Sequence, residues 1–148
     1  MPCGAEDVGL EGEAVIATER EDLAAEAEAI IEMSEPAAHV FRFVRQYGNK
    51  GVSLLALMLA GRDPVNIQAI LQALSSMSHP ETHDERLMTI CGELHHAAPA
   101  VRIQAAQGLA YMGDQRAVPY LENAIARERK PEWAAELQWA LELLKESA

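Results

Sequence analysis

Apolar side chains recur every three or four residues along most of this chain, which is the spacing of one face of an α-helix. Three segments show the pattern most clearly: they carry Ile67, Ile70, Leu71 and Leu74, then Val101, Ala105, Leu109 and Met112, and finally Leu137, Ala140, Leu141 and Leu144. None of them alternates apolar and polar residues as a half-buried β-strand does. The pattern therefore predicts an all-α protein.

Each of these segments begins with a proline, and the prolines are spaced like the starts of a repeated unit. Pro64, Pro99 and Pro131 lie 35 and then 32 residues apart, and each is followed nine and ten residues later by a small residue and a leucine. Proline in the first turn of a helix gives up no hydrogen bond, so we predict that a helix begins at each of them. The small residues, which allow neighbouring helices to pack closely, are Ala73, Gly108 and Ala140.

A second helix is predicted in each unit, so that each unit forms a helical hairpin. The apolar faces of these second helices carry Leu87, Ile90, Cys91 and Leu94 in one unit and Val118, Leu121 and Ile125 in the next. Asp114, directly after Gly113, is a candidate cap between two helices. Upstream, residues 36–47 and the almost wholly apolar stretch 52–60 predict an earlier hairpin. We expect this apolar helix at the centre of the stack, because neighbours must cover it.

The chain divides into an acidic amino-terminal segment, residues 1–35, and a repeat domain, residues 36–148. Residues 1–17 are rich in Glu and Gly, a composition that predicts disorder. Residues 20–33 predict a helix that caps the stack, and about eight helices are expected in all. The apolar face of the capping helix consists of Leu23, Ala27, Ile30 and Ile31.

The net charge of −11 is concentrated at the amino terminus. Residues 1–35 hold eleven acids and one base. Residues 36–62, in contrast, hold no acid and four cations, which are Arg42, Arg45, Lys50 and Arg62. Three roles are open for the acidic segment: a solubilising tail, a segment that folds back on these cations, or one that engages a basic partner.

One unit carries a recognisable repeat signature over residues 101–125. Val-Arg opens its first helix, two alanines pack that helix, Gly-Asp closes the turn, and Ala-Val-Pro-x-Leu begins the second helix. The matching residues are Val101, Arg102, Ala105, Ala106, Gly113, Asp114, Ala117, Val118, Pro119 and Leu121. The unit closely resembles a HEAT-like repeat of the phycobilisome-lyase type, from which it departs at Gly108 and Ala110.

The resemblance implies an α-solenoid: a right-handed superhelix of HEAT-like helical hairpins in two layers. In such solenoids the second helices line a concave face that commonly binds another protein. The resemblance does not imply chromophore lyase activity, because the same repeat recurs in many unrelated roles.

A metal site is the strongest catalytic candidate, since six potential ligands fall within eighteen residues: His79, His83, Asp84, Cys91, His95 and His96. Periodicity instead places Cys91 in an apolar stripe and the His95-His96 pair at a helix end, where a cation is favoured. A HEAT-like iron hydroxylase binds iron through His-Glu dipeptides, and no histidine here is followed by Glu. A phosphate-binding loop and a nucleophile elbow are also missing. We predict no metal, no cofactor and no catalytic residue.

Several classes of partner and location are disfavoured. A DNA-binding solenoid needs a basic concave groove with aromatic faces, and only the stretch from Arg42 to Arg62 is basic, so nucleic acid is not expected. The most apolar run, residues 51–61, is too short to span a bilayer, and the acidic start is unlike a signal peptide. Two cysteines give no disulfide framework. These features predict a cytoplasmic protein that does not enter membranes.

The leading hypothesis is a non-catalytic protein-binding module or adaptor that holds another protein, possibly a basic one, on its concave face. Candidate contact residues are Asp84, His95, Arg116 and Arg127 on the second helices, the cations Arg42, Arg45, Lys50 and Arg62, and Trp139. Trp139 is included because it lies six residues from Trp133 and so faces another side of the helix, nearer solvent. Two alternatives remain: a bilin lyase-like enzyme subunit, and an inhibitor that neutralises a basic protein.

Overall fold

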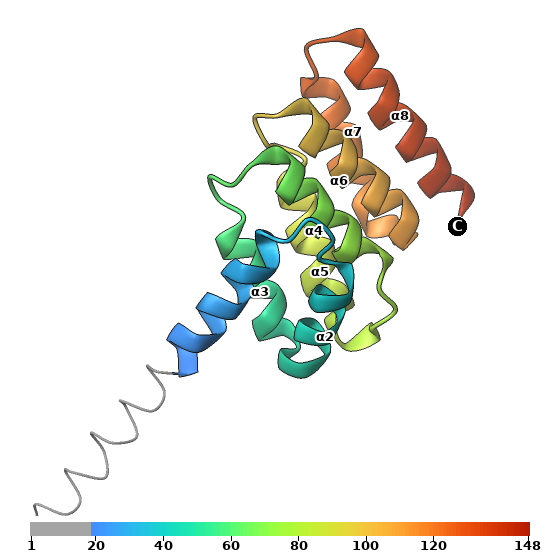
Figure 1. The fold of residues 1–148 in the computed structure, drawn as a ribbon. Helices are drawn as coiled ribbons and strands as arrows, with labels where there is room; N and C mark the ends of the chain where they lie inside the picture. The colour runs from blue at the N-terminus through green and yellow to red at the C-terminus, as the bar shows by residue number, and fades with distance from the viewer. Residues whose placement is uncertain (1–18) are drawn as a thin grey trace, which may run out of the picture.

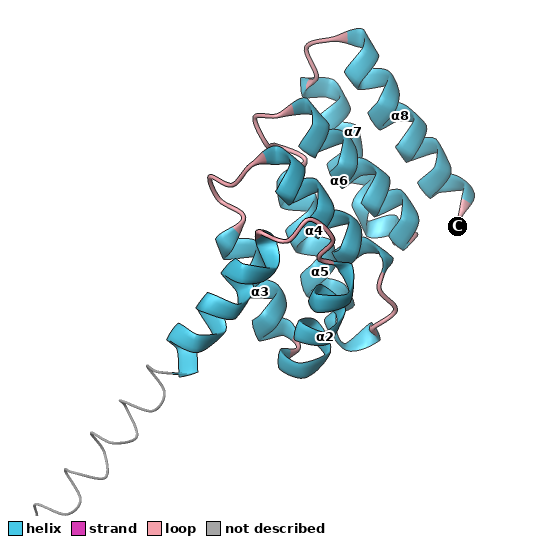
Figure 2. Ribbon diagram, viewed as in Figure 1, coloured by secondary structure: helices cyan, strands magenta, loops and turns pink. Residues whose placement is uncertain are grey.

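The computed structural model describes residues 19–148, and this part of the chain is all-α, with no β-strand (Figures 1 and 2). Its helices are residues 19–31, α2 (Ala37–Tyr47), α3 (Asn49–Met58), α4 (Pro64–Ser76), α5 (His83–Glu93), α6 (Pro99–Met112), α7 (Val118–Arg127) and α8 (Pro131–Glu146). Short 3-10 turns at Pro80–Thr82 and Gln115–Ala117 lead into α5 and α7. The all-α prediction is confirmed. The disorder predicted for residues 1–17 falls outside the described residues.

The helices stack in two layers and form an α-solenoid, as predicted (Figure 1). The first layer holds α2, α4, α6 and α8, each packed against the next. The second layer holds α3, α5 and α7, and each of these helices also packs against a helix of the first layer. Helices of the two layers therefore alternate along the chain from α2 to α8.

All three predicted proline starts are confirmed. Helices α4, α6 and α8 begin at Pro64, Pro99 and Pro131. In α4 the start is reinforced by Asp63, whose side chain accepts a hydrogen bond of 2.9 Å from the backbone N–H of Val65. Local sequence signals alone therefore place these three helices.

The predicted cap between α6 and α7 is confirmed as well. Gly113 follows α6 with a φ of 68°, a left-handed conformation that glycine adopts at little cost. The side chain of Asp114 then accepts a hydrogen bond of 3.0 Å from the backbone N–H of Arg116. This Gly-Asp turn separates the two helices of the best-formed unit.

The small residues ahead of the repeated leucines are buried and set the spacing of the first layer. At Gly108 the backbone of α6 comes so near α4 that a Cβ built there would lie 3.0 Å from the Cβ of Ser75. An alanine, which is usual at this position of the repeat, would have to push the two helices apart. The close approach of α6 to α4 therefore explains the departure at Gly108.

A buried arginine holds the end of α4, and the sequence patterns did not reveal it. Arg86 of α5 is only 2% exposed. Its guanidinium donates hydrogen bonds to the carbonyl oxygens of Leu74 at 2.7 Å, Met77 at 3.1 Å and His79 at 2.9 Å. The last carbonyl groups of a helix lack partners within the helix, so Arg86 acts as their cap. Burial lowers the pKa of the Arg86 guanidinium.

The apolar stretch of residues 52–60 does not lie at the centre of the stack, so that prediction is wrong. Most of this stretch forms α3, near the amino-terminal end of the solenoid, and Leu57 is 70% exposed there. The helix of residues 19–31, α2 and α5 cover parts of α3, but they leave the side that carries Leu57 open. The apolar face expected for this helix is buried in the core and consists of Leu23, Ala27, Ile30 and Ile31.

Candidate partner-binding surface

A polar cluster joins the second helices α5 and α7 at their amino-terminal ends. Nη2 of Arg116 donates to Oδ1 of Asp84 at 2.6 Å and to Oδ2 of Asp114 at 2.7 Å. Nε2 of His83 lies 2.8 Å from the same oxygen of Asp114. Two of the candidate residues, Asp84 and Arg116, are thus in direct contact although they lie in different repeat units.

Asp114 is the charged centre of this cluster, and most of its side chain is shielded from solvent. The side-chain hydrogen bonds from Arg116 hold the pKa of Asp114 well below its usual range, although burial acts in the opposite direction. The backbone N–H of Arg116 and the ring of His83 lower this pKa further. The carboxylate therefore stays ionised at neutral pH and fixes Arg116 in the position from which it reaches Asp84.

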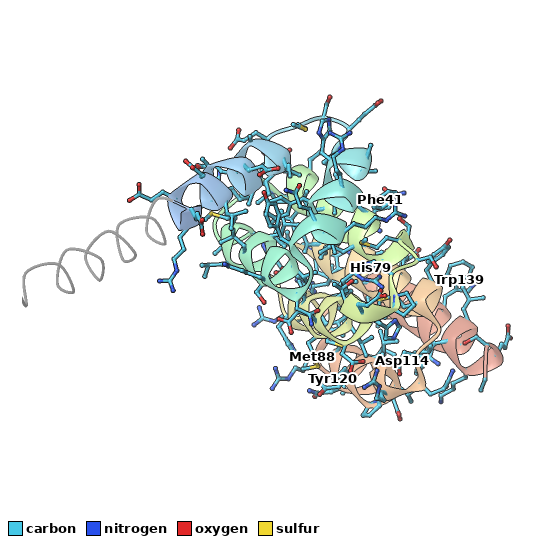
Figure 3. All side chains as sticks on the ribbon, turned by 90° about the horizontal axis from the view of Figure 1, so that it is seen from below. Phe41, His79, Met88, Asp114, Tyr120 and Trp139 are labelled. Atoms are coloured by element: carbon cyan, nitrogen blue, oxygen red, sulfur yellow. The ribbon has the colours of Figure 1, made fainter. Side chains whose placement is uncertain are left out.

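Two large apolar side chains are exposed beside the cluster. Met88 follows Asp84 by one helical turn in α5 and is 55% exposed, and Tyr120 lies in the first turn of α7 and is 42% exposed. Figure 3 shows both of them on one side of the molecule, away from Trp139. An apolar centre bordered by charged residues is the usual anatomy of a protein-binding surface.

His95 and Arg127, two further candidates, lie at the carboxyl-terminal ends of α5 and α7. They line a hollow of about 500 Å³ between the α5–α6 turn and the α7–α8 turn. At its floor, Arg102 of α6 donates two hydrogen bonds to the carboxylate of Glu128, at 2.7 and 3.0 Å. The guanidinium of Arg102 also lies over the ring of Trp133, 5.4 Å from its centroid. Arg102 was evident only as part of the repeat signature, and its partners were not predicted.

The four candidate cations of the first hairpin do not form one patch. Arg42 and Arg45 are exposed on α2 and share a shallow hollow there. Lys50 borders a different, apolar groove between α3 and the helix of residues 19–31. Arg62 forms ion pairs of 3.0 and 2.7 Å with two glutamates of the acidic segment. The structure thus brings one of these cations, Arg62, against the acidic segment.

Those two partners of Arg62 are Glu28 and Glu32. The first lies in the helix of residues 19–31 and the second directly follows it. Their hydrogen bonds raise the pKa of the Arg62 guanidinium. The ion pairs tie this helix to the turn between α3 and α4.

Trp139 lies in α8, in the first layer of helices, apart from the candidates on the second helices. It is 55% exposed, whereas Trp133 is half-buried, so the predicted order of exposure is confirmed. It lines a shallow groove together with Tyr111 of α6 and Leu143. Trp139 and the second-helix candidates therefore belong to different surfaces.

The candidate metal ligands are spread over separate environments. Cys91 is buried in the apolar face of α5, as predicted, and burial raises the pKa of its thiol to about 11. His95 and His96 come directly after α5, which ends at Glu93, so the pair lies at a helix end, as predicted. Within the part of the chain that the structure describes, no three His, Cys, Asp or Glu side chains are grouped as metal ligands.

The repeat region matches a known family model. The model described as HEAT repeats covers residues 52–142. No curated protein and no solved structure gives a match. None of the helices in residues 19–148 is both long and apolar enough to cross a membrane. HEAT repeats in general mediate contacts between proteins. The family match extends over more than half of the chain, and the chain therefore belongs to the HEAT repeat family.

Proposed function

We propose that this chain is a non-catalytic protein-binding module whose second helices, α5 and α7 above all, contact the partner. The observation that carries the proposal is the exposed pair of Met88 and Tyr120 beside the ion pair of Asp84 and Arg116. Burying a large apolar side chain contributes about 1.5–3 kcal/mol, and tyrosine is a frequent anchor of binding energy. Such a pair supplies the apolar centre that a partner would cover.

The polar cluster supports the proposal in a second way. Because Asp114 holds Arg116, which in turn holds Asp84, the rim of this surface is ordered before any partner arrives. A surface that is already ordered loses less conformational entropy on binding. The face of α5 and α7 is therefore pre-organised in the free chain.

The two alternative functions, a bilin lyase-like subunit and an inhibitor of a basic protein, stay predictions. No observation on residues 19–148 favours one over the other. Both alternatives also require contact with another protein, so the surface test below bears on all three functions.

Affinity capture with three forms of the full chain tests the proposal. The forms are the wild type, Met88→Glu/Tyr120→Glu, and the control Tyr111→Glu, which alters an exposed aromatic of the first layer. The partner retained by the wild type is then purified and titrated by calorimetry. We expect the double variant to weaken binding by at least about tenfold, or roughly 1.4 kcal/mol, because it places two charges in the apolar centre.

The control should change the affinity by less than about twofold, since lone surface substitutions outside an interface cost little. Circular dichroism shows whether all three forms keep the same helix content. If the double variant binds as well as the wild type while Tyr111→Glu does not, the first layer is the binding face and the proposal is wrong.

A further inference from the structure

The hollow between the α5–α6 turn and the α7–α8 turn differs in charge from the rest of the chain. Its charged lining residues are Arg102, Arg127, Arg129 and Glu128, together with the two histidines of the α5–α6 turn. The chain as a whole carries a net charge of −11. A local excess of cations in an acidic protein attracts anionic groups.

The floor of the hollow is fixed by hydrogen bonds, and they neutralise Glu128, the one acid among residues 19–148 that lines the hollow. Glu128 is almost fully buried, and both of its carboxylate oxygens accept hydrogen bonds from Arg102. Nη1 of Arg102 donates to the carbonyl oxygens of His96 at 2.9 Å and Ala97 at 3.0 Å. Arg102 therefore ties the two turns together and keeps the hollow open.

The rim supplies the cations that remain available. Arg127 and Arg129 are exposed, and neither forms an ion pair with any of residues 19–148. An arginine guanidinium binds a carboxylate through two parallel hydrogen bonds. Two such groups beside a hollow of about 500 Å³ can accept two neighbouring acidic side chains.

We propose that this hollow binds an acidic peptide segment of the protein partner, through carboxylates held by Arg127 and Arg129. The inference rests on the proposed function, and it adds the chemistry of one part of the partner. A nucleic acid fits less well. The cations gather in one hollow instead of following a groove. In addition, Arg102 and Lys130 already lie over the ring of Trp133, with Nζ of Lys130 4.6 Å from the ring centroid, so a base would have to compete with these cations to stack on it.

Fluorescence anisotropy with the full chain tests the inference. The probe is a fluorescein-labelled ten-residue peptide of alternating Glu and Ala, and its partner probe has Gln in place of every Glu. We expect the Glu peptide to bind and the Gln peptide not to bind. Arg127→Glu/Arg129→Glu should weaken binding of the Glu peptide by about tenfold or more, because each carboxylate loses its cation and meets a like charge.

The matched control is Arg42→Glu/Arg45→Glu, which makes the same change of net charge on exposed residues of α2. It should weaken binding by no more than about twofold, through long-range charge alone. An equal loss of affinity for the Glu peptide in the two double variants would mean that binding depends only on the net charge of the protein, and the inference would be wrong. Tighter binding of a ten-nucleotide single-stranded DNA, with the same sensitivity to Arg127 and Arg129, would overturn the choice of a peptide.

The indole N–H signals of the two tryptophans can show where on the protein the peptide binds. In a nitrogen-15 correlation spectrum we expect the Glu peptide to shift the indole N–H signal of Trp133, which lines the hollow, and not that of Trp139. A shift of Trp139 alone would place the peptide elsewhere and overturn the inference.

Failure of this inference can be told apart from failure of the proposed function. Met88→Glu/Tyr120→Glu should lose the partner but keep the Glu peptide. If the partner binds Arg127→Glu/Arg129→Glu as tightly as it binds the wild type, only the acidic-segment inference fails. If the Glu peptide binds as expected and Met88→Glu/Tyr120→Glu still holds the partner, only the proposed function fails.

Discussion

The guanidinium of Arg86 in α5 lies against the end of α4 and donates a hydrogen bond of 2.7 Å to the carbonyl oxygen of Leu74. The arginine is buried and forms no ion pair with any carboxylate of residues 19–148, so its hydrogen bonds to backbone oxygens and to Oγ1 of Thr82 offset the cost of burying its charge. The Arg86 side chain therefore holds the end of α4 against α5.

We expect Arg86→Met to lower the free energy of unfolding by about 3 kcal/mol, because it leaves several buried carbonyl groups without donors. Urea denaturation followed by circular dichroism measures this change. Arg45→Met, at an exposed position of α2, is the control and should stay within about 0.5 kcal/mol of the wild type. Equal stability of Arg86→Met and the wild type would show that water replaces the guanidinium without loss.

Gly108 and Gly92 should respond in opposite ways to the same substitution. Gly108→Ala should lower the free energy of unfolding by about 1–2 kcal/mol, since the new Cβ would meet Ser75 at 3.0 Å. Gly92→Ala, in α5 with nothing within 4 Å of the new Cβ, should raise it by up to about 1 kcal/mol, because alanine favours a helix over glycine. Thermal unfolding of both variants measures the pair. A gain at both positions would mean that α4 and α6 can move apart freely.

Acid should weaken the contribution of Asp114 to folding. Its pKa is lowered in the folded chain, chiefly by the hydrogen bonds from Arg116, so its contribution is present above the unfolded pKa of about 3.9 and is lost as the pH falls toward the folded value. We expect Asp114→Asn to be less stable than the wild type by about 1 kcal/mol at pH 7, and this gap to shrink below about pH 4.

Urea denaturation at pH 7, 4 and 2.5 measures that gap. Asp63→Asn is the control, because Asn keeps a capping oxygen at α4 and Asp63 forms no ion pair with any of residues 19–148. The difference in stability between Asp63→Asn and the wild type should therefore be smaller than the difference for Asp114→Asn. A gap at Asp114 that stays constant with pH would contradict the prediction.

Cys91 should react slowly with thiol reagents in the folded protein. Burial, aided by the negative charge of Asp114, raises the pKa of its thiol to about 11, so very little reactive thiolate is present at pH 8. In a Cys3→Ser background, where Cys91 is the only thiol, labelling by a disulfide reagent should be slower than in urea by at least about tenfold. Rapid labelling without denaturant would show that α5 opens readily.

Patterns within about ten residues determined much of this fold. The proline starts of α4, α6 and α8, the turn at Gly113 and the buried stripe containing Cys91 all follow from helix periodicity and local backbone preferences. Helix periodicity and backbone preferences depend only on residues close together in the chain, so they can be recognised in a single sequence. The HEAT-type repeat then implied how the hairpins stack.

Only the tertiary structure decided which residues meet across the stack. Asp84 and Arg116, or Arg102 and Glu128, lie 32 and 26 residues apart, and their contact depends on the height and rotation of neighbouring helices. The exposure of Leu57 was missed for the same reason, since the number of helices covering α3 cannot be read from α3 itself. The sequence by itself determined the helices and the repeat. The packing of one helix on another decided the buried Arg86 cap, the charged rim beside Met88 and Tyr120, and the basic hollow, because each brings together groups from different helices or turns.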